Sequence, residues 1–360
     1  MPQHNLPETP STTESHQTPS LKKLLNTISI CALIIAIVAW SFMRAPTLYQ
    51  QAARGLSRLT GHISTVDTLH SDTKLPEQSR SSHMMARTPV YFLSHGGPNI
   101  MYDIYHPAYR KLQEIGNEIT TKVKPRAVVV FSAHWQGKPD TVLVNEGELE
   151  SLIYDFYGFP SHYYKETYPN VGSKELAQKV IDLIQEAGMK AEGVKRGLDH
   201  GVWSSFKCAF EPKMNPLNVP IVQVSLFDTE DPDQHYRLGQ AVQKLRDDNI
   251  LIIVSGMAVH NLRDLRFVFE GDGKPLPYAV SFDEALKEAV MTEPASRQAA
   301  MAKLLNRGDA RKAHPSMEHL LPIHVGAGAA GTDHGKRLWT MPEGSMSWAQ
   351  FRFGEPSVAR

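Results

Sequence analysis

The sequence predicts an α/β domain over residues 88–358, preceded by one membrane-spanning helix. Two observations carry this prediction. The first is a series of short, continuous apolar runs that alternate with amphipathic segments after residue 88. The second is an uncharged apolar stretch over residues 24–43. The domain is expected to be a single one, with a central, mostly parallel or mixed sheet flanked by helices.

Residues 1–21 are expected to form a disordered tail. The segment is rich in Pro, Ser and Thr and almost free of large apolar side chains. Such a composition cannot bury enough apolar surface to offset the entropy that is lost on ordering. Residues 44–87, between the apolar stretch and the predicted domain, are also polar and are expected to form a linker.

The stretch over residues 24–43 favours a signal-anchor helix. It is about 20 residues long without a charge, which is the length of a helix that spans a bilayer, and Trp40 suits an interfacial position. Three alternatives remain open: a cleaved secretory signal, a mitochondrial presequence and a buried globular helix. The expected location is therefore a membrane, with a single N-terminal anchor. The alternative locations are the mitochondrion and the cytoplasm. The cytoplasm is expected if the extension before Met84 or Met85 is not expressed.

From residue 88 the chain alternates between strand-like and helix-like segments. Continuous apolar runs predict strands that are buried on both faces, over residues 89–96, 127–135, 219–226 and 250–260. A helical period of apolar residues predicts helices over residues 109–123, 174–188, 234–248, 281–292, 295–308 and 316–331. No GxGxxG motif follows a strand, so a Rossmann cofactor site is not expected.

The composition argues against two classes of protein and draws attention to one residue type. The formal net charge is zero, which removes the electrostatic case for nucleic-acid binding. Two cysteines, Cys31 and Cys208, are too few for a disulfide framework, and neither lies in a CxxC pair. Histidine is the unusual residue, because sixteen are present and several follow the apolar runs.

Three of the four predicted strands end in a histidine: His95 in FLSHGG, His134 in FSAHW and His260 in MAVHN. Because ligands of open α/β sheets bind beyond the carboxyl ends of the strands, these side chains are expected to converge. Two further candidates are His200 in GLDHGVW and His319, which is expected to open an apolar helix. A cluster of neutral imidazoles suits Fe(II) or zinc. The alternative is a set of separate core histidines, each satisfied by its own hydrogen bond.

At these residues the sequence resembles a known family. The segments SHGGPN, PRAVVVFSAHW, YDFYGFP, DHGVW, SGMAVHNLR and HPSMEHLLPIHVGAGAAG occur in this order. Together they resemble the 4,5-DOPA dioxygenase branch of the class III extradiol ring-cleavage dioxygenases, which have the LigB-like fold. The resemblance runs from about residue 88 to the C-terminus. It implies a metal-dependent enzyme that uses O₂ to open a catechol-type aromatic ring to a semialdehyde.

The resemblance also assigns roles to the histidines. It implies an acid/base role for His200, and Asp199 is expected to hold this imidazole in one tautomer. One divalent metal ion per chain is implied, Zn(II) or Fe(II), with Fe(II) required for a dioxygenase. The expected partners are a catechol and O₂, and the oligomeric state is not predicted. The implied metal ligands are His95, His134, His260 and His319.

The YDFYGFP segment is expected to line the substrate pocket, with Tyr154, Phe156 and Tyr157 in contact with an aromatic substrate. The alternative is that these rings only pack the loop. Two rival functions also remain open. One is a zinc-dependent hydrolase that activates water in the same histidine site. The other is a non-catalytic binding protein with the same fold.

Overall fold

The computed structural model describes residues 87–265 and 274–356. The predicted tail (1–21), membrane helix (24–43) and linker (44–87) lie outside these ranges, apart from Arg87 at the end of the linker. They therefore stay predictions. Within the described ranges, no helix combines the length and the apolar character that crossing a membrane requires.

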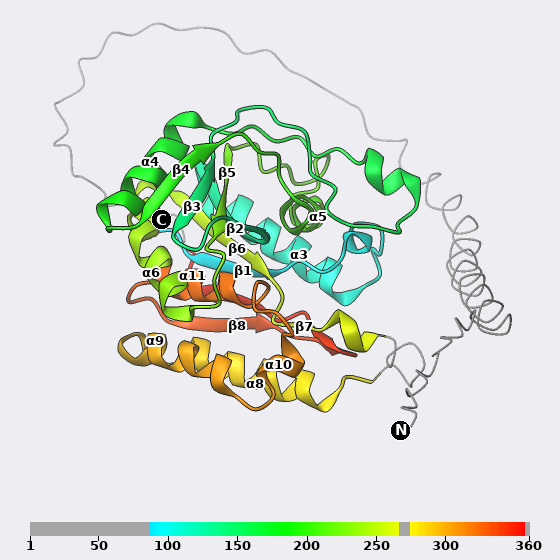
Figure 1. Cartoon of the computed structure of the whole chain (residues 1–360). Coiled ribbons are helices and arrows are strands. Elements are labelled where there is room, and N and C mark those ends of the chain that lie inside the picture. Colours follow the sequence, from blue (N-terminus) through cyan, green and yellow to red (C-terminus); the bar gives the residue numbers. More distant parts are fainter. Residues whose placement is uncertain (1–86, 266–273, 357–360) are drawn as a thin grey trace, which may run out of the picture. The chain divides into compact units, whose positions relative to one another are not determined.

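An eight-stranded sheet forms the centre of the described domain (Figure 1). The neighbours β5, β2, β6 and β1 are parallel to one another, as are β3 and β4. Antiparallel pairs join β3 to β5, β11 to β1 and β8 to β11, so the sheet is mixed and mostly parallel, as predicted. The strands in spatial order are β4 (Lys190–Val194), β3 (Thr141–Asn145), β5 (Ile221–Leu226), β2 (Ala127–Gln136), β6 (Ile250–Gly256), β1 (Val90–Ser94), β11 (Gln350–Phe353) and β8 (Gly335–Trp339).

Both faces of the sheet are covered, which explains the continuous apolar runs. In β2, Val128 and Val130 face one apolar cluster, whereas Val129 and Phe131 face the other. All four side chains are fully buried. Because side chains alternate between the faces of a strand, a strand that is buried on both sides is apolar at successive positions rather than at every second one.

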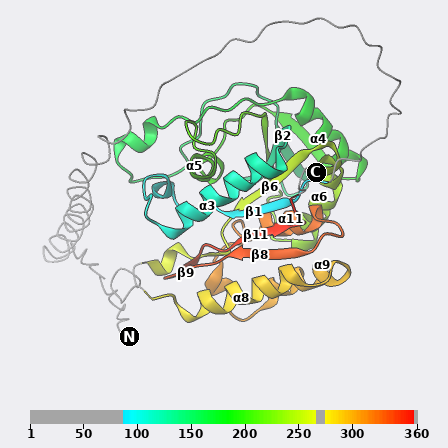
Figure 2. The ribbon, with the colours of Figure 1, turned by 180° about the vertical axis from the view of Figure 1, so that it is seen from behind.

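The helices form the two outer layers. Helices α3 and α5 pack on one face, and Figure 2 shows α3 beside β1. The remaining helices pack into the other cluster, with α8 and α9 beyond β8 in Figure 1. The α-helices are α3 (Pro107–Glu118), α4 (Lys174–Glu186), α5 (His200–Ala209), α6 (Pro232–Val242), α8 (Pro277–Met291), α9 (Pro294–Lys303), α10 (Ala310–Ala313) and α11 (Leu321–Ala329).

Short elements connect these layers. A small three-stranded sheet contains β7 (Val259–His260), β10 (Met346–Ser347) and β9 (Pro342–Glu343). A π-helical turn, η2 (Ile119–Val123), extends α3. The 3-10 helices are η1 (Pro98–Met101), η3 (Ser161–Lys165), η4 (Gln243–Asp248), η5 (Leu262–Asp264) and η6 (Leu304–Asn306).

Side-chain caps fix where three of the helices begin. The Ser173 side chain accepts a hydrogen bond from the Leu176 N–H at the start of α4. Asp231 accepts two such bonds at the start of α6, and His106 accepts one at the start of α3. A proline follows each of the last two caps, in a position where its missing N–H costs nothing.

Two predicted elements differ from the structure near the candidate site. The strand expected over 250–260 is divided into β6 and β7, with a break after Gly256. The helix expected over 316–331 begins only at Leu321, so His319 lies in the turn before it. Pro322 in the first turn of α11 suits this later start, because proline is favoured there and disfavoured inside a helix.

Candidate metal centre

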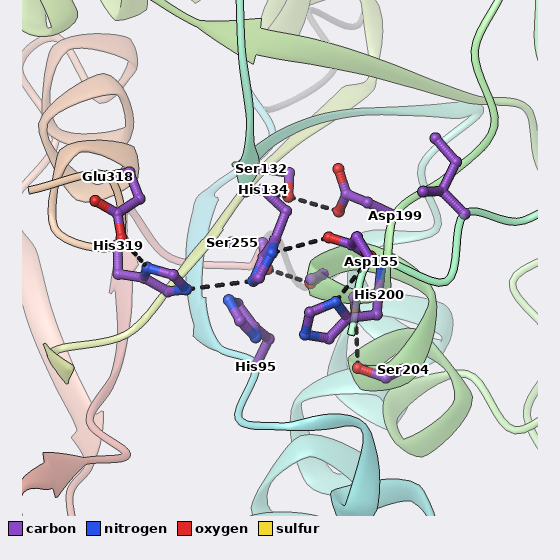
Figure 3. A network of polar contacts seen from close by, with 12 residues as sticks. His95, Ser132, His134, Asp155, Asp199, His200, Ser204, Ser255, Glu318 and His319 are labelled. Carbon is purple, nitrogen blue, oxygen red and sulfur yellow. Dashed lines mark hydrogen bonds and ion pairs between the residues drawn. The ribbon is translucent and has the colours of Figure 1, made fainter. Parts of the chain in front are cut away.

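Three histidines meet at the carboxyl edge of the sheet. Strands β1, β6 and β2 are parallel neighbours, so their carboxyl ends lie side by side. His95 follows β1, His134 lies near the end of β2, and His200 is the first residue of α5. One nitrogen from each lies within 4.8 Å of the others. Figure 3 shows the three imidazoles facing the same space. The strand ends predicted this convergence for His95 and His134, and the structure adds His200 to the group.

Two glycines leave room for histidines of the site. A Cβ on Gly201, the second residue of α5, would lie 2.6 Å from Cδ2 of His134. A Cβ on Gly256 would lie 2.3 Å from the carbonyl oxygen of His319, which accepts the Met257 N–H at 2.9 Å. Both distances are well below van der Waals contact, so a side chain at either position would push a histidine out of the site.

In four of the site histidines, Nδ1 lies against an oxygen atom. Carbonyl and ionised carboxylate oxygens only accept hydrogen bonds, so each Nδ1 must carry a proton, and in the neutral imidazole Nε2 then keeps a lone pair. A metal-binding imidazole is usually held in this way by a partner on its other nitrogen. The contacts are His95 with Gly96 O at 2.7 Å, His134 with Asp155 Oδ2 at 2.9 Å, His200 with Asp155 Oδ1 at 2.8 Å and His319 with Glu318 Oε1 at 2.9 Å.

This set of donors fits a metal ion. Nε2 of His95 is buried and has no hydrogen-bond partner. Nε2 of His134 and Nε2 of His319 lie 3.2 Å apart. Two nitrogens bound to one metal at about 2.0–2.1 Å lie about 2.9–3.4 Å from each other, so the observed spacing suits a shared ion. Imidazole nitrogens favour Fe(II) or zinc over magnesium or calcium.

The charges of the site suit a cation as well. Burial lowers the pKa of His95, His200 and His319, so these imidazoles are neutral at pH 7, the form that binds metals. Burial acts in the same direction on His134, but the contact with Asp155 and nearby carboxylates outweighs it and raises the pKa. Burial also opposes ionisation of Asp155, yet hydrogen bonds from the two histidines dominate and lower its pKa far below the usual range.

A second group of side chains that could hold a metal ion adjoins the first and contains His260, Glu318 and His319. The His260 ring stacks on the His319 ring, with centroids 3.6 Å apart and planes inclined by 15°. The ligand roles of His260 and His319 stay predictions. The four implied ligands thus divide between two touching groups, His95 and His134 in the first and His260 and His319 in the second.

Asp199 does not hold His200, contrary to the sequence-based expectation. Its fully buried carboxylate accepts hydrogen bonds from Ser132 Oγ at 2.7 Å and Arg196 Nη1 at 3.0 Å, and also from Gln223. Asp199 is the N-cap of α5 and His200 its first residue, and neighbouring residues at a helix start point in different directions. Asp199 therefore supports the end of β2 instead.

Asp155 is the site residue that the sequence analysis missed. Its two carboxylate oxygens contact His134 and His200, which are 21 and 45 residues away in the chain (Figure 3). The residue lies inside YDFYGFP, where only the aromatic rings were considered. The available signal was a lone acidic residue in an otherwise apolar motif.

The aromatic residues of this motif occupy different environments. The Phe156 ring is buried and lies edge-on to the His200 ring, with centroids 5.4 Å apart. The Tyr154 hydroxyl donates to the Glu166 carbonyl at 2.7 Å, so this ring is anchored in the loop. Tyr157 is 90% exposed. Phe156 thus touches a site histidine, and the three substrate contacts stay predictions.

The fold and the histidine groups define an α/β protein with a candidate metal centre at the carboxyl edge of its sheet. Residues 82–347 match the family described as the catalytic LigB subunit of aromatic ring-opening dioxygenase. The match covers most of the chain, and the chain belongs to this family. It is an extradiol ring-opening dioxygenase and thus an oxidoreductase.

Individual relatives agree with this assignment. A 4,5-DOPA dioxygenase extradiol from Beta vulgaris is 34% identical over 268 residues, which are 73% of this chain and 96% of the relative. The dioxygenase tasH from Hapsidospora irregularis is 31% identical over 279 residues, covering 72% of this chain and 83% of the relative. The crystal structure of an uncharacterized protein from Escherichia coli K12 superposes with a TM-score of 0.60. It is 28% identical and covers 74% of this chain and 100% of that one.

These comparisons confirm the LigB-like resemblance and the dioxygenase prediction. They also decide between the rival functions, because a ring-opening dioxygenase is neither a hydrolase nor a non-catalytic binding protein. The chain is therefore an enzyme whose histidines could hold a metal ion.

Proposed function

We propose that the chain is an Fe(II)-dependent dioxygenase that opens a catechol ring related to DOPA, with O₂ as the second substrate. The observation that carries the proposal is the group formed by His95, His134 and His200, with one nitrogen from each within 4.8 Å of the others. Family membership supports the reaction class. The name of the Beta vulgaris relative supports DOPA as the first substrate to test.

His95 and His134 would hold the metal through Nε2. The unpartnered Nε2 of His95 and the 3.2 Å spacing between His134 and His319 support this choice and make His319 the next ligand. His260, which lies in one group with His319, would complete the set. Fe(II) bound at this place supplies one-electron chemistry toward O₂, which redox-inert zinc lacks.

His200 is proposed to move the protons of the reaction. Its Nδ1–H donates to Asp155, so its Nε2 lone pair is the one that faces the site. Burial lowers the pKa of this imidazole, which is therefore neutral and able to accept a phenolic proton at pH 7. The same nitrogen would return the proton to the product when the ring opens beside one hydroxyl, which gives a semialdehyde.

The substrate pocket is proposed to include the YDFYGFP loop. The Phe156 ring lies against His200 and offers an apolar surface for a planar aromatic ring. Tyr154 and Tyr157 flank it in the chain. An aromatic substrate held there would present its hydroxyl groups toward the histidines rather than toward water.

The experiment uses the full-length protein, prepared without air and loaded separately with Fe(II) and Zn(II). O₂ uptake is followed with L-DOPA and with simpler catechols, together with the visible absorbance of a yellow semialdehyde. The proposal expects uptake with iron only, matched one-to-one to product. Uptake with zinc would overturn the metal assignment, and no uptake with any catechol would overturn the substrate class.

We further propose that residues 24–43 attach the enzyme to a membrane, because the stretch is apolar, uncharged and about 20 residues long. The full-length protein should remain in the membrane pellet after alkaline carbonate extraction. Removal of residues 1–87 should release it. A full-length protein that is found in the supernatant would refute the anchor.

A further inference from the structure

One carboxylate contacts two site histidines that come from different elements. Oδ2 of Asp155 accepts from Nδ1 of His134, on β2, at 2.9 Å. Oδ1 accepts from Nδ1 of His200, at the start of α5, at 2.8 Å. The two rings are 4.1 Å apart between centroids and inclined by 59°. Figure 3 shows Asp155 linked to both rings, so a single side chain orients a strand histidine and a helix histidine together.

We propose that Asp155 is a positioning residue that couples the metal ligand His134 to the acid/base residue His200. The inference rests on the proposed function for these two roles. By holding a proton on each Nδ1, the carboxylate keeps both Nε2 lone pairs turned into the site. One lone pair is then available to a metal ion, and the other to a proton of the substrate.

The loop that carries Asp155 is anchored to the segment around His200. The Ile153 N–H donates to the Leu198 carbonyl at 2.8 Å, and the Ile153 carbonyl accepts from Nε1 of Trp203 at 2.9 Å. Leu198 and Trp203 flank His200 in the chain, and both are buried. Asp155 therefore has a fixed position relative to His200, as a positioning residue requires.

A third contact indicates which oxygen of Asp155 the NH₂ group of an asparagine would replace. The main-chain N–H of His200 also donates to Oδ1, at 3.0 Å, so Oδ1 accepts two hydrogen bonds and Oδ2 accepts one from His134. In Asp155→Asn, the amide oxygen should stay at the Oδ1 position and the NH₂ group should face His134. Nδ1 of His134 would then have to accept, and its proton would move to Nε2, where it blocks metal binding. The variant is expected to disable His134 and to spare His200.

The test compares Asp155→Asn and Asp155→Ala in the full-length protein. Zn(II) affinity is measured by competition with a chromophoric chelator, and turnover is measured separately at saturating Fe(II). Both variants should lose affinity by about 10- to 100-fold. At saturating Fe(II), the kcat of Asp155→Ala should be at least ~10-fold lower than that of Asp155→Asn, because only the alanine variant also leaves His200 without its orienting partner.

Two results would overturn the proposal. Unchanged Zn(II) affinity in Asp155→Asn would show that the carboxylate does not set the tautomer of His134. An equal kcat in both variants at saturating Fe(II) would show that it does not orient His200. The asparagine variant has the size of the native residue, so it carries the affinity test even if the alanine variant does not fold, which thermal melting would reveal.

Asp199→Asn is the matched control for charge. It removes a buried carboxylate next to His200 in the chain, but one that bonds Ser132, Arg196 and Gln223 rather than an imidazole. Its Zn(II) affinity should stay near the wild-type value. An equal loss of affinity in Asp155→Asn and Asp199→Asn would mean that only the removed charge matters, and it would overturn the proposal. The affinity test needs no turnover. If the enzyme opens no catechol but Asp155→Asn still loses zinc, the proposed function fails while the link to His134 stands.

Discussion

Buried histidines occur in two regions of the molecule, and their surroundings differ. At the carboxyl edge of the sheet, the imidazoles of His95, His134 and His200 direct nitrogens into one shared space. In the helical layer, His324 lies between two main-chain carbonyls, with Nε2 3.2 Å from Met301 O and Nδ1 3.4 Å from Leu320 O. His95, His200 and His324 are all buried, so burial does not separate the two regions. What distinguishes the site is that one nitrogen from each of its three histidines lies within 4.8 Å of the others.

The largest expected effect is that of His134→Ala. This change removes one of the three histidines that could hold the metal, and it also removes the side chain that contacts Asp155 and His319. Zn(II) affinity should fall by more than ~100-fold. That value is the upper limit of the loss expected when a residue that only supports a ligand is replaced. Chelator competition measures it. His324→Gln is the matched control from the helical layer and should keep the wild-type affinity, so a loss in both variants would break the comparison.

His200→Ala should separate proton transfer from metal binding. At saturating Fe(II), turnover should fall by ~100-fold or more, because the group that accepts the phenolic proton is missing. Metal content, determined on the same preparation, should remain that of the wild type. Loss of the metal would instead identify His200 as a ligand and would join its role to that of His134.

The helical layer should respond to pH through stability. Burial lowers the pKa of His324 to about 4, whereas an unfolded histidine has a pKa near 6.5. Below pH 6.5 the unfolded chain therefore binds a proton that the folded chain does not. The free energy of unfolding should fall as the pH drops from 6.5 to 4, by roughly 3 kcal/mol for this residue, and should not change through His324 above pH 6.5.

Urea unfolding of the wild type and His324→Gln at several pH values measures this contribution. The curve of the variant should be less steep between pH 6.5 and pH 4, because glutamine does not titrate. Equal slopes would mean that His324 does not carry the pH dependence.

The smallest expected effect is that of Tyr157→Ala. The side chain is 90% exposed, so the free energy of unfolding should change by less than about 0.5 kcal/mol. If the ring contacts the substrate, the loss of an aromatic contact of about 0.5–1.5 kcal/mol should raise KM about 2- to 10-fold. Steady-state kinetics with L-DOPA tests this contact, and an unchanged KM would remove Tyr157 from the pocket.

The sequence identified the central strands and their histidines because both signals are local. The run from Ala127 to Phe131 is apolar at every position, as is typical of a strand covered on both faces. The outer strands were missed for the opposite reason. In β4, Lys190 and Glu192 are exposed, and β8 is only half-buried, so neither gives a continuous apolar run.

Asp155 and Asp199 show why the carboxylate contacts were not predictable. The sequence places Asp199 next to His200, but the helix start directs its side chain toward Ser132 and β2. Asp155 reaches His200 from a distant loop through a contact that exists only after folding. Neighbourhood in the chain is a poor guide wherever one of the residues begins a helix.

The pairing of β11 with β1 has a consequence for the order of events during synthesis. Val90 pairs with Phe353, about 260 residues further along the chain, and such a distant contact forms slowly. The side chain of Gln350, in β11, donates to the Ser94 carbonyl at 3.1 Å, directly before His95. Strand β1, which precedes His95, therefore has β6 as a neighbour but lacks its second neighbour until β11 has been synthesised. We expect stable metal binding only after β11 has been synthesised and has paired with β1.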